Sequence, residues 1–241
     1  DKAYDEDRDK LLMDMYEGGV CNIVNVGFDE QKSKNSIDLS EEYPFIYAAV
    51  GVHPHEVSKA SKDYIDVIKS FVQNEKVVAI GEIGLDYHYD LSPRDEQKIA
   101  FEDQLKLAKE LDVPVIIHNR EAHEDTLNLL KKYKPKGVVH CFSGSEEISR
   151  EILKLGMYIG LGGAVTFKNA KNPILVAKSV PLDRLVLETD APYMAPVPFR
   201  GKRCNSSMIM ETAKVIAGVR GMDVEDLLES TKENAQKLFN I

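Results

Sequence analysis

The sequence has 241 residues, of which 43% are hydrophobic and 29% are charged, and its formal net charge is −9. This balance supports a large buried core and excludes a disordered chain, and the length fits one domain spanning residues 1–241. The acidic excess argues against a wide, non-specific surface for nucleic acid, because such binding depends mostly on Lys and Arg that neutralise phosphates.

Short apolar runs alternate with longer amphipathic segments along the chain. The first segment, residues 5–17, has a helical pattern that stops at Gly18 and Gly19. The seven runs that follow are apolar almost throughout, which is typical of parallel strands buried on both faces. The predicted strands are residues 21–26, 45–51, 77–83, 113–118, 137–142, 158–160 and 185–190.

The clearest helix between these strands is predicted for residues 95–111, where apolar side chains form one stripe. Ser92 and Pro93 precede it, and they predict a serine cap with proline at the first helical position. Further helices are predicted after Ser206 and over residues 232–239. Strands that alternate with helices indicate βα units and a parallel sheet.

The fold class that this alternation predicts is α/β, a TIM (β/α)8-type barrel. A closed barrel of this type has eight strands, and the sequence shows seven, preceded by a helix and without an initiator Met. We therefore expect that the first strand is missing from this chain. An open or seven-stranded sheet is the alternative.

The cysteines and the lengths of the apolar runs indicate the cellular compartment of the protein. Cys21, Cys141 and Cys204 are odd in number and far apart, which favours reduced thiols over a disulfide framework. No apolar run approaches the ~20 residues of a membrane span, and no signal-peptide pattern opens the chain. These features predict a cytoplasmic protein with no membrane and no obligate protein partner.

Ionisable residues fall at the C-terminal ends of five apolar runs, where the strands of a parallel barrel meet at one face. A charged group there is costly to bury unless a partner or a cation compensates it. Imidazoles mixed with carboxylates suit Zn²⁺, Mn²⁺, Ni²⁺ or Mg²⁺, so the joint pattern predicts a metal site. Taken singly, each histidine also fits a hydrogen-bonded rim residue and the glutamate a helix cap or an ion pair. The five residues are His53, Glu82, His118, His140 and Asp190.

Six motifs contain or adjoin these residues. They are GVHPH at 51–55, GEIGLD at 81–86, IHNR at 117–120, HCFSG at 140–144, ETDAPY at 188–193 and PFRGKR at 198–203. In this order they resemble the motifs of TatD-type deoxyribonucleases, which are amidohydrolase-like metal-dependent hydrolases, and the resemblance covers the whole chain. It implies hydrolysis of phosphodiester bonds in DNA, as a 3′–5′ exonuclease acting on single strands or 3′ ends.

The resemblance also implies a site with two divalent metal ions. Glu82 would bridge both ions, His118 and His140 would hold one, and Asp190 would bind the other and accept a proton from the attacking water. The second ion normally takes two more histidines from a His-x-His motif on the first strand, but no histidine precedes His53 here. We therefore expect this chain to bind one metal ion well and to be a poor catalyst.

Basic residues near the motifs are candidates for phosphate contacts, although each also fits a solvated loop charge. His53 is expected to orient the water or the substrate, and His55 to be a surface or supporting residue. The same metal ligands serve hydrolysis of a small amide, lactone or aminoacyl ester, and a metal-poor barrel that only binds a partner is a third reading. The candidate phosphate contacts are Arg120, Arg200, Lys202 and Arg203.

Overall fold

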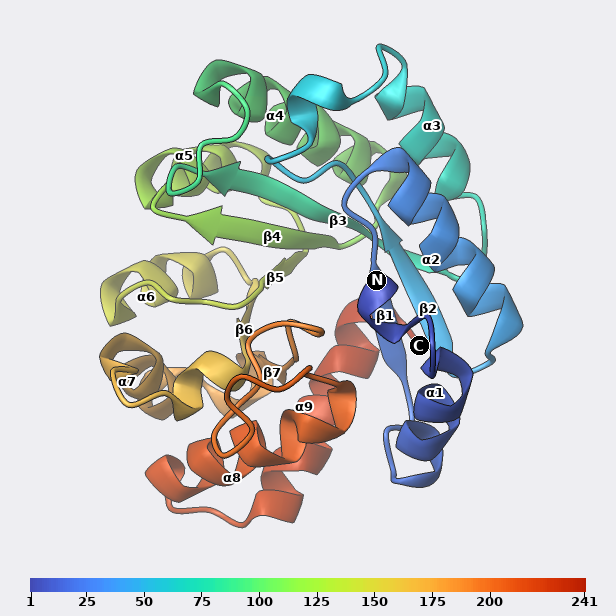
Figure 1. The fold of residues 1–241 in the computed structure, drawn as a ribbon. Helices are drawn as coiled ribbons and strands as arrows, with labels where there is room; N and C mark the ends of the chain where they lie inside the picture. Colours follow the sequence, from blue (N-terminus) through green and yellow to red (C-terminus); the bar gives the residue numbers. More distant parts are fainter. The chain divides into compact units, whose positions relative to one another are not determined.

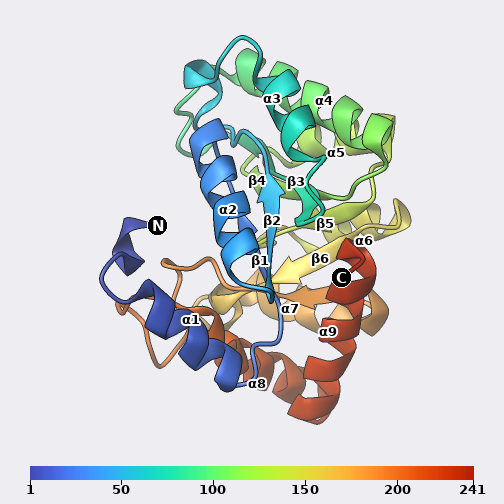
Figure 2. The same ribbon diagram turned by 90° about the vertical axis from the view of Figure 1, so that its right-hand side faces the viewer.

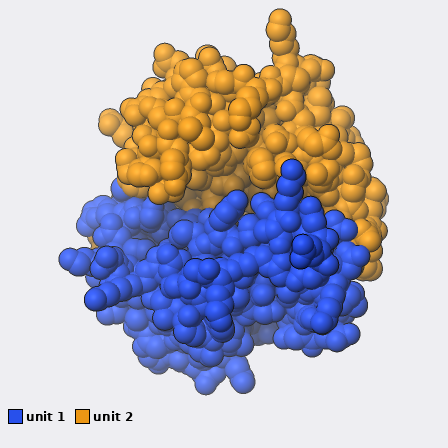
Figure 3. Space-filling view, viewed as in Figure 1, with its two compact units in different colours: residues 1–23, 141–149, 159–235 blue, residues 24–140, 150–158, 236–241 orange.

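The computed structural model describes residues 1–241 and alternates strands with helices along the chain (Figure 1). Its internal contacts divide it into two units, which Figure 3 colours separately, and the single domain expected for the whole chain stays a prediction. Unit 1 comprises Asp1–Ile23, Cys141–Ser149 and Ile159–Ala235. Unit 2 comprises Val24–His140, Arg150–Tyr158 and Gln236–Ile241.

Parallel strands form the centre of unit 2. β2 (Ile46–Val50) pairs with β3 (Val77–Asp86), β3 pairs with β4 (Val115–Arg120), and β4 pairs with β5 (Gly137–Val139). β1 (Ile23–Val26) is the neighbour of β2. β2, β3 and β5 are buried along most of their length, as their continuous apolar sequences predicted, and β4 is buried over its first three residues. β1 differs from the prediction, because each of its four residues is only half-buried.

Helices cover these strands in unit 2. α2 contacts β2, α4 contacts β3 and α5 contacts β4 (Figures 1 and 2). α4 buries Phe101 and Leu105 completely, in agreement with the apolar stripe predicted for this segment. The helices are α2 (Glu30–Glu42), α3 (Tyr64–Phe71), α4 (Arg94–Leu111) and α5 (His123–Tyr133), and α6 (Glu146–Lys154) extends over the boundary of the units.

The predicted start of α4 is wrong in one detail. Pro93 is the residue before the helix rather than its first residue, and no side chain caps it. The hydroxyl of Ser92 donates instead to the carbonyl oxygen of His55 at 3.3 Å and accepts the backbone N–H of Ser58 at 3.3 Å. The serine therefore stabilises the loop that carries His55, and its hydroxyl is not available to the helix.

Unit 1 holds the other two strands and the remaining helices. β6 (Tyr158–Leu161) pairs in parallel with β7 (Leu185–Leu187), and α8 contacts both β7 and α7. The side-chain amide of Asn234 donates to two backbone carbonyl oxygens beside β7, at 2.7 and 2.8 Å, and so fastens the last helix. The helices are α1 (Arg8–Glu17), α7 (Lys171–Ser179), α8 (Ile209–Arg220) and α9 (Val224–Phe239).

All seven predicted strands are present, but one boundary matters for the site. β3 does not stop at Ile83, because Leu85 and Asp86 still pair with Asn119 and Arg120 of β4. The sequence had placed Glu82 near the end of a strand. In the structure it lies inside the strand. No helix is both long enough and apolar enough to cross a membrane.

Replacing Gly84 with Ala is expected to cost more than about 2 kcal/mol of unfolding free energy, because β3 and β4 approach closely there. Gly84 has a φ of +145°, and a Cβ atom would lie 1.9 Å from the carbonyl oxygen of His118. Gly156→Ala is the control, since Gly156 also has a positive φ of +81° but nothing within 4 Å of its Cβ position. Chemical denaturation of both variants measures the difference, and equal losses would contradict the close-approach argument.

Candidate metal centre

Three imidazole rings surround the carboxylate of Glu82 in unit 2. Its Oε1 atom lies 2.9 Å from Nδ1 of His118, 2.6 Å from Nε2 of His140 and 3.5 Å from Nε2 of His53. One ligand atom from each of His53, Glu82 and His118 lies within 4.8 Å of the others. The structure thus brings together four of the five residues that the sequence predicted for the metal site.

The strands of unit 2 place these side chains. His118 is the fourth residue of β4, beside β3, which carries Glu82. His140 directly follows β5, and its backbone N–H donates to the carbonyl oxygen of Ile117 at 3.0 Å. His53 lies beyond the end of β2 and is 8% exposed. Apolar strands therefore carry these polar side chains to one point, with Glu82 and His118 inside β3 and β4 and with His53 and His140 beyond the ends of β2 and β5.

The charges in the cluster favour a cation. Burial raises the pKa of Glu82, but the imidazoles of His140, His53 and His118 outweigh it and hold the pKa well below its usual range. Burial lowers the pKa of His118, but its hydrogen bonds to Asp86 and Glu82 outweigh that effect and raise it. Glu82 therefore keeps its negative charge, and His118 beside it holds a proton more readily than a free histidine does.

Hydrogen bonds separate the roles of the histidines. Nδ1 of His53 accepts the backbone N–H of His55 at 3.1 Å, so neutral His53 carries its proton on Nε2, the nitrogen nearest Glu82. His53 therefore offers an N–H donor there, whereas a metal ion requires a lone pair. Burial, the largest effect on His53, lowers its pKa and keeps the ring neutral.

The carboxylate and imidazole groups around Glu82 are donors of the kind that a divalent metal ion takes. One carboxylate oxygen lies 2.9 Å from one imidazole nitrogen and 2.6 Å from another. Both separations are those of hydrogen bonds. The group whose ligand atoms all lie within 4.8 Å of one another is His53, Glu82 and His118, and His140 joins this group through Glu82. Imidazole with carboxylate is a combination that Zn²⁺ and other first-row divalent ions accept.

Two buried glutamines of α4 hold the backbone next to the site. Gln104 accepts the N–H of Val52 at 2.8 Å and donates to its carbonyl oxygen at 3.0 Å, one residue before His53. Gln97 makes the same pair of bonds to Asp86, at 2.9 and 3.2 Å. The sequence predicted a role for neither glutamine. Two amides seven positions apart on an otherwise apolar helix face are the signal that could have revealed them.

Asp86 is a third residue near the site for which the sequence predicted no role. It is fully buried, and its Oδ2 atom lies 3.0 Å from Nε2 of His118 and 2.9 Å from Nε2 of His55. His55 is therefore a supporting residue, which was one of the two expectations for it. Because Glu82 and Asp86 are four apart on one strand, they share a face, and this spacing was visible in the sequence.

The remaining predicted acid belongs to unit 1. Asp190 is exposed and lies three residues beyond β7, and its backbone carbonyl oxygen accepts the N–H of Tyr193 at 2.7 Å. Glu188 lies between the strand and Asp190, and its Oε1 atom accepts the backbone N–H of Cys141. A hydrogen bond to Cys141 thus holds Glu188, the first residue of the polar segment after β7.

The four candidate phosphate contacts differ in their surroundings. In unit 2, the Arg120 guanidinium lies 4.7 Å from the ring centroid of Tyr89. In unit 1, Arg200 lies 3.9 Å from the centroid of Phe167 and donates to the carbonyl oxygen of Ala195 at 3.3 Å. The Lys202 ammonium lies 5.7 Å from the Phe199 ring, and Arg203 forms a two-bond ion pair with Asp7 at 2.7 and 2.5 Å.

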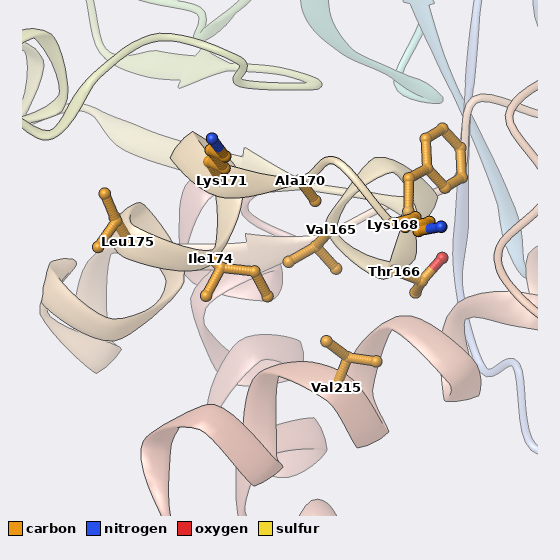
Figure 4. A pocket seen from close by; sticks show the side chains of 9 residues that line it. Val165, Thr166, Lys168, Ala170, Lys171, Ile174, Leu175 and Val215 are labelled. Atoms are coloured by element: carbon orange, nitrogen blue, oxygen red, sulfur yellow. The ribbon is translucent and has the colours of Figure 1, made fainter.

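A pocket of about 610 Å³ adjoins Phe167 in unit 1. Figure 4 shows the aliphatic side chains of Val165, Ile174 and Val215 around it, from the 3₁₀ turn Gly163–Thr166, α7 and α8. Lys168 and Lys171 also line it and are exposed. Apolar surface with cations at its edge, next to the Arg200–Phe167 stack, is chemically suited to a nucleic-acid base and its phosphates.

Comparison with known proteins places the chain in a family. A family described as TatD related DNase matches residues 1–240. The chain belongs to the TatD family. The uncharacterized metal-dependent hydrolase YabD of Bacillus subtilis is 46% identical over 243 residues, with 100% of this chain and 95% of YabD covered. Membership of this family of metal-dependent hydrolases agrees with the donor set around Glu82.

A TatD protein with a more specific name is also similar. The 3′-5′ ssDNA/RNA exonuclease TatD of Erwinia tasmaniensis is 34% identical, with 98% of this chain and 95% of that protein covered. Among solved structures, the TatD homologue YJJV of Escherichia coli K12 has a TM-score of 0.92 and 32% identity, with 99% of this chain and 93% of that chain covered. This likeness confirms the predicted α/β fold of TIM-barrel type.

Proposed function

We propose that this TatD family protein hydrolyses phosphodiester bonds of single-stranded DNA from the 3′ end. The observation that carries the proposal is the carboxylate of Glu82 with two imidazole nitrogens, of His118 and His140, within 2.9 Å. The similarity to the Erwinia tasmaniensis relative, which is named as an ssDNA/RNA exonuclease, supports this substrate class.

Glu82, His118 and His140 hold a divalent metal ion in this proposal, and a second ion takes Asp190 among its ligands. Bound there, such ions lower the pKa of a coordinated water and polarise a phosphoryl oxygen. The charge on Glu82, which its neighbours keep ionised, supports the first assignment. The ETDAPY motif at 188–193 supports the second, with Asp190 accepting the proton of the attacking water. Zn²⁺, Mg²⁺, Mn²⁺ and Ni²⁺ are the candidate ions.

Other side chains bind and orient the DNA strand. His53 donates its Nε2–H to an oxygen of the scissile phosphate or of the water, since its other ring nitrogen already accepts a backbone N–H. Arg200 and Lys202 contact phosphates in unit 1, and Arg120 contacts one in unit 2. Arg203 contributes less, because its guanidinium is already paired with Asp7.

The test is cleavage of a short single-stranded oligonucleotide with added Mg²⁺, Mn²⁺ or Zn²⁺, together with elemental analysis of the purified protein. A label at the 5′ end is expected to remain on progressively shorter products, and a phosphorothioate 3′ linkage to block them. Bound metal without cleavage would favour a small amide, lactone or aminoacyl ester as substrate, a class that the net charge of −9 also suits. Protein that neither retains nor binds metal would instead favour a partner-binding role.

Arg200→Ala is expected to weaken binding of single-stranded DNA about tenfold and to reduce its salt dependence by roughly one unit of slope. The guanidinium is held over Phe167 and is exposed, so its removal deletes one phosphate contact with little effect on folding. Arg8→Ala is the matched control, because Arg8 is exposed and bonded only to neighbouring Asp9. Fluorescence anisotropy over a salt series measures both; the same loss in both variants would show a general charge effect.

A further inference from the structure

A buried carboxylate lies on the far side of His118 from Glu82. Asp86, the last residue of β3, is 0% exposed, and its Oδ2 atom lies 3.0 Å from Nε2 of His118. The other ring nitrogen of His118, Nδ1, lies 2.9 Å from Oε1 of Glu82. The imidazole is therefore held between two acidic side chains of the same strand, one on each nitrogen.

The Asp86 carboxylate is fixed from several sides. Its Oδ1 atom accepts the backbone N–H groups of His88 at 3.0 Å and Tyr89 at 2.8 Å. Its Oδ2 atom also meets Nε2 of His55 at 2.9 Å. Gln97 bonds both its backbone N–H and its carbonyl oxygen. A carboxylate in these surroundings acts as an acceptor, so the His118 nitrogen that faces it must donate.

We propose that Asp86 is the positioning residue for His118. Between two carboxylates, both ring nitrogens donate, Nε2 to Asp86 and Nδ1 to Glu82. When a metal ion takes the place of the Nδ1 proton, Asp86 would keep the remaining proton on Nε2, so that the lone pair of Nδ1 would face the ion beside Glu82. A metal ligand needs that lone pair, and a carboxylate that bonds the remote nitrogen selects both the tautomer and the ring orientation. The inference rests on the proposed function, in which His118 and Glu82 hold a divalent ion.

Asp86→Asn tests the proposal with a side chain of the same shape. The amide can still accept the two backbone N–H groups, but its NH₂ faces His118 as a donor and draws the ring proton to Nδ1. We expect the affinity for Zn²⁺, measured by competition with a chromophoric chelator, to fall about 10–100-fold. The far-ultraviolet circular dichroism of the variant should match that of the unmodified protein.

Asp125→Asn is the matched control. Asp125 is a carboxylate of the same unit that bonds the hydroxyl of Tyr87 at 2.6 Å and the ammonium of Lys98 at 3.1 Å, and it touches none of the clustered histidines. Its affinity for Zn²⁺ is expected to stay within twofold of the unmodified protein. Glu82→Gln removes the anionic ligand itself. Its affinity for Zn²⁺ is the reference value for a protein that has lost the site.

The outcomes separate this inference from the proposed function. If Glu82→Gln loses Zn²⁺ and Asp86→Asn binds it as tightly as the unmodified protein, Asp86 only stabilises its own turn and the inference is overturned. Unmodified protein that binds no Zn²⁺ overturns both. Should Asp86→Asn fail to fold, ¹⁵N chemical shifts of the His118 ring in the unmodified protein loaded with Zn²⁺ decide: a proton on Nε2 supports the inference, and one on Nδ1 contradicts it.

Discussion

Glu82→Gln is expected to reduce metal-dependent hydrolysis by at least about a thousandfold, the largest effect of any substitution in this chain. The amide has the shape of the carboxylate but no charge, and it places two N–H donors where the imidazole nitrogens of His118 and His140 converge. The charge that balances a divalent ion is then absent. Steady-state rates on single-stranded DNA at saturating Mn²⁺, with bound metal determined on the same sample, measure the loss.

The control for this substitution is Glu110→Gln. Glu110 is 59% exposed at its side chain and forms a surface ion pair with Lys69, so the same chemical change there leaves the cluster intact. Surface pairs of this kind contribute little to stability, and the control should retain full activity. Hydrolysis by Glu82→Gln at more than a tenth of the unmodified rate would show that the metal-dependent step does not use this carboxylate.

Removal of the bound metal is expected to lower the Tm by roughly 5–15 °C. An ion present at 100 to 1,000 times its Kd stabilises the folded state by about 2.7–4.1 kcal/mol, and 1 kcal/mol shifts the Tm of a domain of this size by about 2–4 °C. Calorimetry of chelator-treated protein, before and after addition of Zn²⁺, gives the shift. The reason is mass action, because the unfolded chain does not bring Glu82, His118 and His140 together.

Two histidine variants locate the origin of that shift. His140→Asn removes a nitrogen that lies 2.6 Å from Glu82, so its Tm should respond little to Zn²⁺. His88→Asn is the control, since the His88 ring pairs with Glu121 at the surface and not with Glu82. A Zn²⁺-dependent shift that survives in His140→Asn would place the stabilising ion elsewhere in the molecule.

The order of the strands and the ionisable residues that meet around Glu82 could be predicted because both leave a local signature. A parallel strand buried on both faces must be apolar throughout, so each appears as a run bounded by polar residues. Against such a run, an ionisable residue such as His118 or His140 is conspicuous, since it has no reason to be there unless something compensates its burial. The motif GEIGLD identified the central glutamate in the same way.

The predicted end of β3 was wrong because the prediction relied on the same apolar pattern. The prediction ended this strand at Ile83, where the apolar run gives way to the more mixed sequence that leads to Asp86. In the structure, pairing with β4 continues through Asn119 and Arg120, because hydrogen bonds between backbones do not depend on apolar side chains. Glu82 consequently lies within the strand, at the irregularity in its pairing with β4 between Ile80 and Ile83.

The sequence by itself thus determined the succession of βα units, the family and the side chains that can ligate a metal. Only the tertiary structure decided what each of those side chains meets: His53 accepts a backbone N–H, and His118 has Glu82 at one ring nitrogen and Asp86 at the other. The physical reason is that a buried polar group must find a partner, and the partner comes from another strand or helix. Periodicity along one segment indicates which face a residue occupies, but the packing of β3, β4 and α4 against each other determines what it meets there.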